Sequence, residues 1–289
     1  MSKRILKTIL LMALVAATLL LTACGKKEPP APTATPMPPA AHGYPNGAVS
    51  GQDKLDILNK LDTNHELLYI FEAESDSKDV AKMLGSTYES PLRLDGEGYV
   101  RGSGDEGFVK LTVDRLDERI YWKDSNVYFR VEKNVLGEKG NDTFNRVKQQ
   151  NSLQSRLIKA VSIPQQLSFL KENVDLLSMD ISGDNVYIVL KDVNAQNLKR
   201  LLQPQVNYTY YTSLRGGIIS DSVSILSTDE ILLEWVFNLT EQRPLEISYQ
   251  ALINLSYVGM RSICNLENFY RYGLVKNPEL PPPEKINWE

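Results

Sequence analysis

The chain has 289 residues, with 32 Lys and Arg against 36 Asp and Glu, and its formal net charge is −4. This acidic balance argues against a nucleic-acid partner, which requires a basic face. Only two histidines and two cysteines are present, so the sequence offers little material for zinc sites, catalytic triads or a disulfide framework. Stability must therefore come from a hydrophobic core.

The N-terminus has the layout of a secretory signal. Three cations, Lys3, Arg4 and Lys7, precede an uncharged apolar run that ends in small side chains near residue 23. These features are the n-region, h-region and cleavage site of a signal peptide. A transmembrane helix is the alternative, but the run is short for a span of about 20 residues and is followed by charged residues. We therefore expect residues 1–23 to be a signal peptide.

The segment Leu21-Thr22-Ala23-Cys24 resembles the lipobox of bacterial lipoproteins. The resemblance implies that Cys24 is diacylglycerated, becomes the mature N-terminus and carries palmitate-type acyl chains. The alternative is an incidental cysteine in an ordinary signal or anchor helix. Loss of residues 1–23 removes three cations and no anion, so the net charge falls from −4 to about −7. Acyl chains, not attraction to anionic headgroups, must then hold the protein at the membrane.

Composition divides the remainder into three parts. Residues 24–52 contain seven of the fifteen prolines and almost no large apolar side chain, which predicts a flexible tether that begins at the lipidated cysteine. Residues 53–277 contain only four prolines and show periodic apolar residues, as expected of one sizeable domain. Residues 278–289 are again rich in proline and form a C-terminal tail.

Most of the domain has the two-residue period of half-buried strands. Residues 231–239 and 245–257 alternate large apolar with polar side chains on either side of a short turn, which predicts an antiparallel hairpin with one face on a core. Shorter hairpins are predicted to turn at Asp124-Ser125 and Gly183-Asp184. Further strands are predicted at 97–104, 106–114, 206–214 and 221–227, for a total of about nine to eleven.

Four helices are predicted between these strands. They cover residues 53–62, 143–161, a segment that starts at Pro164, and 194–203, the last capped by Asn194 and ended by Pro204. Many antiparallel strands with a few helices indicate an α+β fold. We expect one large curved antiparallel sheet, a half-barrel, with the helices on its concave side.

The order of these elements resembles the LolA/LolB-like lipoprotein-carrier superfamily, including LppX-type lipoproteins. Residues 120–131, 183–202 and 234–255 carry the resemblance. It implies an open half-barrel of roughly eleven strands whose interior holds acyl chains or another apolar ligand. The sequence leaves open whether helices fill the concave face. An apolar cavity of several hundred Å³ there would favour a carrier, whereas a solid core would argue against one.

Other candidate sites have simpler structural interpretations. His42 is expected in the tether and His65 just before the first strand, and neither has a nucleophile partner nearby in sequence. Cys264 is predicted to be a buried apolar thiol on a strand. The glycine-rich segment 96–107 precedes a β-like stretch, which favours a hairpin or bulge over a phosphate loop. We expect no cofactor and no metal.

Carboxylates and tyrosines complete the candidates. Acidic residues at 114–118 and 227–230, and the segment 180–185, are predicted to be solvated turns, not catalytic pairs or a calcium loop. Fourteen tyrosines are present, and those near 208–211 and 270–272 either serve as strand residues or line a ligand site or an interface.

These observations predict a non-enzymatic lipoprotein on the extracytoplasmic side, anchored through Cys24 to the outer face of the cell membrane or to the outer membrane. It is expected to bind or carry a hydrophobic or lipid-linked ligand. The alternative is an envelope assembly protein with a filled, ligand-free half-barrel that contacts a protein partner.

Overall fold

The computed structural model describes residues 42–61, 66–83, 86–113, 116–124, 126–133, 139–140, 143–146, 162–213, 223–257 and 260–275. All belong to the unit Pro39–Glu289. The predicted signal peptide, Cys24, His65 and the tail 278–289 lie outside the described residues.

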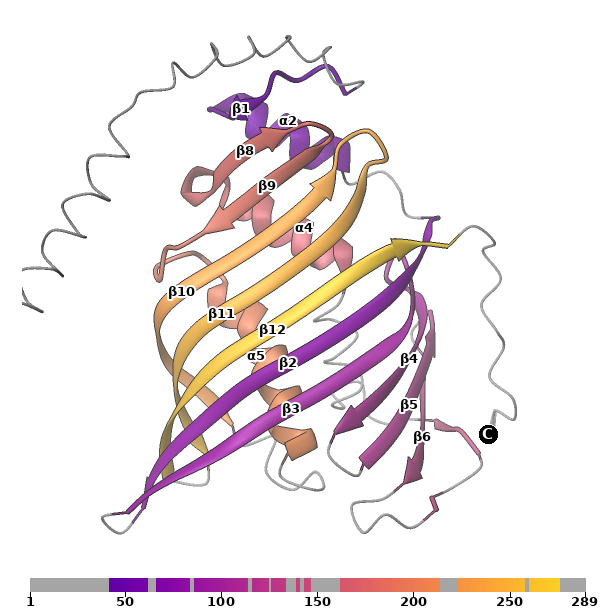
Figure 1. Ribbon diagram of the computed structural model, residues 1–289, viewed down its shortest axis with the longest axis vertical. Helices are drawn as coiled ribbons and strands as arrows, with labels where there is room; N and C mark the ends of the chain where they lie inside the picture. The colour runs from indigo at the N-terminus through magenta and orange to yellow at the C-terminus, as the bar shows by residue number, and fades with distance from the viewer. Residues whose placement is uncertain are drawn as a thin grey trace, which may run out of the picture. The chain divides into compact units, whose positions relative to one another are not determined.

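One large, curved antiparallel sheet forms the framework of this unit (Figure 1). Within the described residues its order is β1-β8-β9-β10-β11-β12-β2-β3-β4-β5-β6-β7. The strands are β1 (Gly47–Ala48), β2 (Leu68–Met83), β3 (Ser86–Arg101), β4 (Glu106–Val113), β5 (Leu116–Lys123), β6 (Asn126–Lys133), β7 (Asn145–Arg146), β8 (Ser178–Ser182), β9 (Asn185–Leu190), β10 (Ser224–Asn238), β11 (Arg243–Tyr257) and β12 (Met260–Leu274). The predicted fold class is thereby confirmed.

Two very short strands stand at the ends of this order and account for most of the difference from the predicted strand number. β1 pairs with β8 through Gly47 and Ala48, and β7 pairs with β6 through Asn145 and Arg146. Neither has the length of a hydrophobic alternation, so a period of two could not reveal them. Short terminal strands also limit edge-to-edge association with other chains.

The helices lie against the concave face (Figure 1). They are α2 (Gln52–Leu61), α4 (Ile163–Glu172), the short 3₁₀ helix η1 (Val174–Leu176) and α5 (Leu198–Ser213). Two predictions are confirmed: α2 matches the helix expected at 53–62, and α4 begins with proline in its first turn. Proline is tolerated there because the first N–H groups of a helix have no partner within it.

The prediction for α5 was wrong at both ends. Asn194 lies before the helix, which begins only at Leu198. The Asn194 N–H donates to the Asp192 carboxylate, 2.7 Å away. It then continues past Pro204 through residues predicted as a strand. Buried positions 198, 201, 202, 205 and 206 follow the helical period on both sides of the proline. Packing on the sheet therefore outweighs the lost hydrogen bond.

Two further predictions are corrected. Residues 143–146 were expected to begin a helix, but Phe144 packs on Tyr121 and Tyr128, and the next two residues form β7. The strands expected at 221–227 and 231–239 form one strand, β10, with register irregularities at Ile225/Ser227 and Asp229/Ile231. These irregularities interrupt the alternation and made one strand look like two.

The structure also shortens the predicted tether. Residues 42–51 contact the domain: the His42 ring bonds to the Gly183 carbonyl at 2.8 Å, and Asn46 Oδ1 accepts a bond from the Gly183 N–H at 2.9 Å. β1 and the bond from the Val49 N–H to the Met179 carbonyl extend this attachment. These contacts are with residues more than a hundred positions away, so local composition could not indicate them.

Candidate functional site

A continuous row of aromatic rings crosses the inner face of the sheet, from α4 over β10, β11, β12 and β2. Neighbouring ring centroids lie between 5.6 and 6.3 Å apart, a spacing at which aromatic pairs attract each other. We call this set the aromatic row. Its members, in order, are Phe169, Trp235, Tyr249, Tyr270, Phe71, Tyr272 and Tyr69.

Strand register builds the row from alternating residues. Trp235 is opposite Ile247, and Tyr249 follows two positions later on the same face. Tyr249 is opposite Asn268, and Tyr270 again follows two positions later. Such diagonal neighbours are within reach of aromatic side chains. The sequence therefore places one ring each on β10 and β11 and two rings each on β12 and β2, along a line that crosses the sheet.

Two buried glutamines join the helices to this row. Gln166 of α4 accepts hydrogen bonds through Oε1 from Trp235 Nε1, at 3.1 Å, and from the Tyr249 hydroxyl. Gln205 of α5 accepts through Oε1 from Asn268 Nδ2, at 3.2 Å, and from the Tyr270 hydroxyl. The contact between helices and sheet is therefore polar along a line, although apolar side chains surround it.

Burial keeps the tyrosines of the row neutral. It raises the pKa of Tyr69 to about 12, with a small opposing effect from Arg243. Desolvation also raises the pKa of Tyr249, Tyr270 and Tyr272 far above the ordinary value. These hydroxyls are therefore hydrogen-bond donors at physiological pH, and no general acid or base of suitable pKa is among them.

The helices cover the inner face in the described residues. The row and its neighbours on β8 to β12 belong to one buried core cluster with residues of α2, α4 and α5. A described hollow of about 280 Å³ lies elsewhere, on the outer face of β2, β3, β4 and β12. Its lining is mostly charged and includes Glu72, Glu74, Glu97, Lys110 and Arg271. This hollow is not the apolar interior cavity that would favour a carrier.

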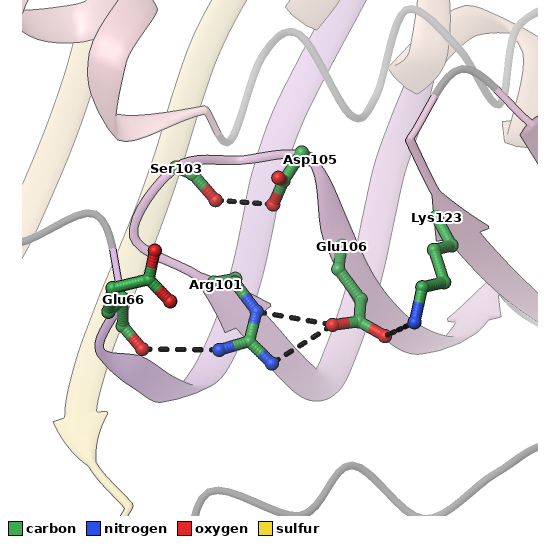
Figure 2. Close-up of polar contacts among 6 residues, drawn as sticks. All are labelled: Glu66, Arg101, Ser103, Asp105, Glu106 and Lys123. Atoms are coloured by element: carbon green, nitrogen blue, oxygen red, sulfur yellow. Dashed lines mark hydrogen bonds and ion pairs between the residues drawn. The ribbon is translucent and has the colours of Figure 1, made fainter.

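A second polar arrangement lies near the β3–β4 turn (Figure 2). Arg101 donates to Glu106 Oε2 through Nε and Nη2, at 3.1 and 2.9 Å, and to the Glu66 carbonyl through Nη1, at 3.2 Å. Lys123 of β5 lies 3.3 Å from the other carboxylate oxygen of Glu106. The hydrogen bond to Glu106 raises the pKa of Lys123. Each charge has an opposite partner, as in a structural clamp between strands.

The predicted site residues have the following places. Cys24 and His65 lie outside the described residues. His42 was expected in a solvated tether but is buried, and its Nδ1 accepts a bond from the Tyr44 N–H at 3.1 Å. Cys264 is fully buried on β12, which confirms a thiol packed in the core. Of the predicted tyrosines, Tyr270 and Tyr272 reach the aromatic row; those near 208–211 belong to α5.

The glycine and carboxylate predictions are partly confirmed. Residues 96–107 form the β3–β4 hairpin, with Gly104 at φ +75° in its turn. Gly183 turns the β8–β9 hairpin at φ +59°, a conformation that favours glycine. Two predictions of solvated turns were wrong. Glu118 is buried on β5. Residues 227–230 are mostly exposed, as expected, but they are part of β10 and not a turn.

Metal and membrane features can be assessed over the described ranges. There, no group of three or more His, Cys, Asp or Glu side chains is placed to hold a metal ion. None of the helices described is both long and apolar enough to cross a membrane.

Comparisons with known proteins give little beyond this geometry. No family model and no curated protein matches the chain. A LolA superfamily protein from Nitrosomonas europaea aligns with 79% of this chain and 96% of its own, at 12% identity and a TM-score of 0.24. A DUF1329 family protein from Desulfovibrio piger aligns with 76% of this chain and 89% of its own, at 8% identity and a TM-score of 0.23. The fold assignment therefore rests on the strand pairing itself.

Sequence reasoning missed the two glutamines. Each occupies a position in the apolar stripe of its helix: Gln166 between Ile163 and Leu170, and Gln205 after Leu201 and Leu202. An amide at such a position must find a hydrogen-bond partner on the surface that the helix covers. A polar residue at a buried helical position was thus the available signal.

Proposed function

We propose that the protein is a lipid-anchored, non-enzymatic component of the extracytoplasmic envelope that binds a hydrophobic or lipid-linked ligand on the inner face of its sheet. α4 and α5 would then form a cover that separates from the aromatic row when the ligand enters. The observation that carries the proposal is the polar line between helices and sheet, made by Gln166 and Gln205.

Such a line lowers the cost of opening. Separating two apolar surfaces loses about 25 cal/mol for each Å² exposed to water. Exposed hydroxyl, indole and amide groups instead exchange protein hydrogen bonds for bonds to water, at a net cost of only about 1 kcal/mol each. Trp235, Tyr249, Tyr270 and Asn268 all place such groups against the helices. Once uncovered, the rings present an apolar floor that suits an acyl chain.

The complete burial of residues in the aromatic row and in α5 favours a second candidate function. Trp235, Tyr249 and Leu202 are fully buried beneath or within the helices. If α4 and α5 never separate from the sheet, the half-barrel is a filled scaffold. The protein would then act through contacts of its outer face with an envelope partner.

Native mass spectrometry of the protein purified from membranes tests the proposal. We expect adducts with the masses of lipids that survive gentle activation. Hydrogen exchange on the same sample should show α4 and α5 exchanging faster than the central strands β10 to β12, because a cover opens without global unfolding. The absence of adducts, together with exchange of α4 and α5 only through global unfolding, would favour the filled scaffold.

The anchor has its own test. Mass analysis of the mature N-terminus should find acyl chains on Cys24, with residues 1–23 removed. The Cys24→Ala variant should retain the signal segment unmodified and lose the acyl chains. An unmodified thiol at Cys24 in the purified wild-type protein would contradict the proposed anchor while leaving the ligand proposal to its own experiment.

A further inference from the structure

A small group of polar side chains lies on the inner face between β2 and β12. Ser75, Ser77 and Asn268 are only 6%, 1% and 2% exposed. Ser75 is directly opposite Asn268 in the strand register, so their side chains adjoin on one face. Apolar residues, including Ala73 and Leu266, surround them. We call these three residues the Asn268 cluster.

One buried polar atom of the Asn268 cluster has no hydrogen-bond partner. Asn268 donates through Nδ2 to Gln205, but its buried Oδ1 accepts no hydrogen bond. Gln205 Oε1 also accepts from the Tyr270 hydroxyl, so it serves two donors of the sheet, and the amide nitrogen of Asn268 faces α5. Asn268 Oδ1 therefore remains a buried acceptor that lacks a donor, a situation rare in folded proteins.

The two serines provide the complementary half. Ser77 Oγ accepts a bond from the Glu267 N–H at 3.0 Å and lies 3.1 Å from Ser75 Oγ. Only one hydroxyl hydrogen is used in the bond between the serines, whichever of them donates. The other hydroxyl hydrogen stays available. The cluster thus offers one acceptor and one donor side by side.

The backbone is also locally open at this level. The β12–β2 register runs continuously except between the pairs Asn265↔Lys78 and Asn268↔Ser75, where two residues of each strand are not paired. The Glu267 N–H there bonds to the side chain of Ser77 in place of a ladder carbonyl. The break in strand pairing and the unsatisfied amide of Asn268 therefore lie at the same level of the sheet. Both lie beneath Gln205 of α5, one of the helices of the proposed cover.

We propose that the Asn268 cluster is a subsite for the hydroxyl group of an acyl-chain ligand. This inference rests on the proposed function, because the cluster is reached only if α5 moves away. The ligand hydroxyl donates its hydrogen to Asn268 Oδ1 and accepts the remaining hydrogen of the serine pair. Its hydrocarbon chain lies along the aromatic row.

This chemistry distinguishes among lipid classes. A hydroxyl group matches both members of the cluster, since it donates one hydrogen and accepts others. An ester carbonyl or an ionised carboxylate can only accept, so it leaves Asn268 Oδ1 unsatisfied and, in the carboxylate, adds a buried charge. The ligands selected are therefore neutral alcohols such as fatty alcohols or acylglycerols with a free hydroxyl.

Three probes with one common chain test the subsite in the full protein: palmityl alcohol, methyl palmitate and sodium palmitate at neutral pH. Affinities are measured by displacement of a fluorescent acyl probe and by native mass spectrometry. We expect the alcohol to bind about tenfold more tightly than the methyl ester, the factor that corresponds to one additional satisfied hydrogen bond. The carboxylate should bind no better than the ester.

Two asparagine variants test whether Asn268 causes the preference for the alcohol over the ester. Asn268→Leu replaces the amide with an apolar group of similar volume, so the alcohol and the ester should bind equally well. Asn173→Leu is the matched control: Asn173 is also a buried asparagine whose Oδ1 accepts no hydrogen bond, but it follows α4 and donates to the Phe169 carbonyl. Its preference for the alcohol should be unchanged. If Asn268→Leu does not fold, Asn268→Ala provides the second test; it also removes the amide oxygen and should likewise abolish the preference for the alcohol.

The outcomes separate the two proposals. If none of the probes binds to the wild-type protein, the proposed function fails. If the wild type binds alcohol and ester equally, or if Asn268→Leu keeps the tenfold preference, ligand binding stands and the subsite is overturned. In that case the Asn268 amide is satisfied by an ordered water instead.

Discussion

The inner face beneath α4 and α5 and the outer face of β4 to β6 both gather aromatic side chains, but they stabilise them differently. The aromatic row is held by neutral hydrogen bonds to Gln166 and Gln205. On the outer face, Tyr121, Tyr128 and Phe144 form a separate cluster, with the Arg130 guanidinium 5.1 Å from the Phe144 ring.

Ion pairs complete this outer arrangement. Arg119 and Arg130 both approach Glu132, at 2.8 and 2.5 Å, and Glu106 joins Arg101 to Lys123. Charges near water are screened by salt, whereas neutral bonds inside a core are not. Tyrosines on the inner face therefore take part in hydrogen bonds whose strength does not depend on salt. Tyrosines on the outer face lie among ion pairs whose strength does.

The largest expected effect is the unfolding of the domain in alkali, which follows from the buried tyrosines of the aromatic row. A tyrosine whose pKa is raised on folding stabilises the native state fully below its unfolded pKa, near 10, and this stability is lost as the pH rises through the folded value. For Tyr69 the window runs from about 10 to about 12, and Tyr270 and Tyr272 act in the same direction. Each costs about 1.4 kcal/mol per pH unit within its window.

We therefore expect the phenolate absorbance of the buried tyrosines to develop together with the loss of tertiary circular dichroism when the domain is titrated above pH 10. Ionisation of the inner tyrosines in a domain that remains folded would contradict their burial. The Tyr272→Phe variant, which removes one such group, should shift the unfolding transition to higher pH.

Trp235→Ala should cause the largest loss of stability among single substitutions. Trp235 is fully buried between Phe169 and Tyr249 and bonds to Gln166. Removal of its indole leaves a cavity and should lower the free energy of unfolding by about 3–5 kcal/mol. Chemical denaturation measures the change. Leu226→Ala on the exposed part of β10 is the control and should change stability by less than about 0.5 kcal/mol.

Gln166→Leu should cost about 2–4 kcal/mol, because it removes the acceptor that Gln166 Oε1 provides for both the Trp235 N–H and the Tyr249 hydroxyl in a buried site. The loss should not depend on salt concentration. In the double variant with Tyr249→Phe part of it should be recovered, since only one donor then loses this acceptor. A strictly additive double-mutant cycle would show that the two side chains do not interact.

Glu106→Gln should cost about 1 kcal/mol at low salt and less at high salt. Glu106 and Arg101 are partly buried, with side chains 15% and 21% exposed, so their pair is screened less than a surface pair. Denaturation at two ionic strengths checks this. Glu97→Gln removes the more exposed partner of Lys110 and serves as the control; an equal effect in both variants would contradict the importance of burial.

The smallest expected effect concerns the contact between the two cover helices. Arg200 of α5 lies 3.0 Å from Glu172 of α4, and the bond from Arg200 is the main cause of the lowered pKa of Glu172. The pair is solvent-exposed, so Arg200→Met should change stability by at most about 0.5 kcal/mol.

The pH dependence of this pair has a definite sign. A lowered carboxyl pKa means that the stabilisation is present above the unfolded pKa and is lost as the pH falls through the folded value. The difference between wild type and Arg200→Met should therefore be largest near neutrality and disappear in acid. A difference that grows on acidification would contradict the pairing.

Much of the fold could be predicted from the sequence, because it depends on strict local alternation. Ile231, Leu233, Trp235 and Phe237 fill one face of β10 as expected, and the turn at Gly183 needs a positive φ that glycine supplies. The register follows once one face must be buried. These features depend on neighbours in sequence, and local patterns report them well.

The candidate site could be predicted only in part. Tyr270 and Tyr272 were recognised as notable, but Gln205 and Asn268 are 63 positions apart and meet through tertiary packing. The extension of α5 past Pro204 likewise depends on the surface of the sheet, which compensates for a bond that the isolated helix would miss. Contacts between residues so far apart in the chain produce no periodic pattern in the sequence.

The attachment of residues 42–51 at the β8 end of the sheet also determines how mechanical load reaches the domain. A pull on residues N-terminal to His42 is borne first by the bonds of His42 and Asn46 to Gly183. The two-residue strand β1 would come next and yield pair by pair. These links are few and would break one after another, before the long strands β10 to β12. A pull from the N-terminal side would therefore detach residues 42–51 from the sheet and leave the aromatic row intact.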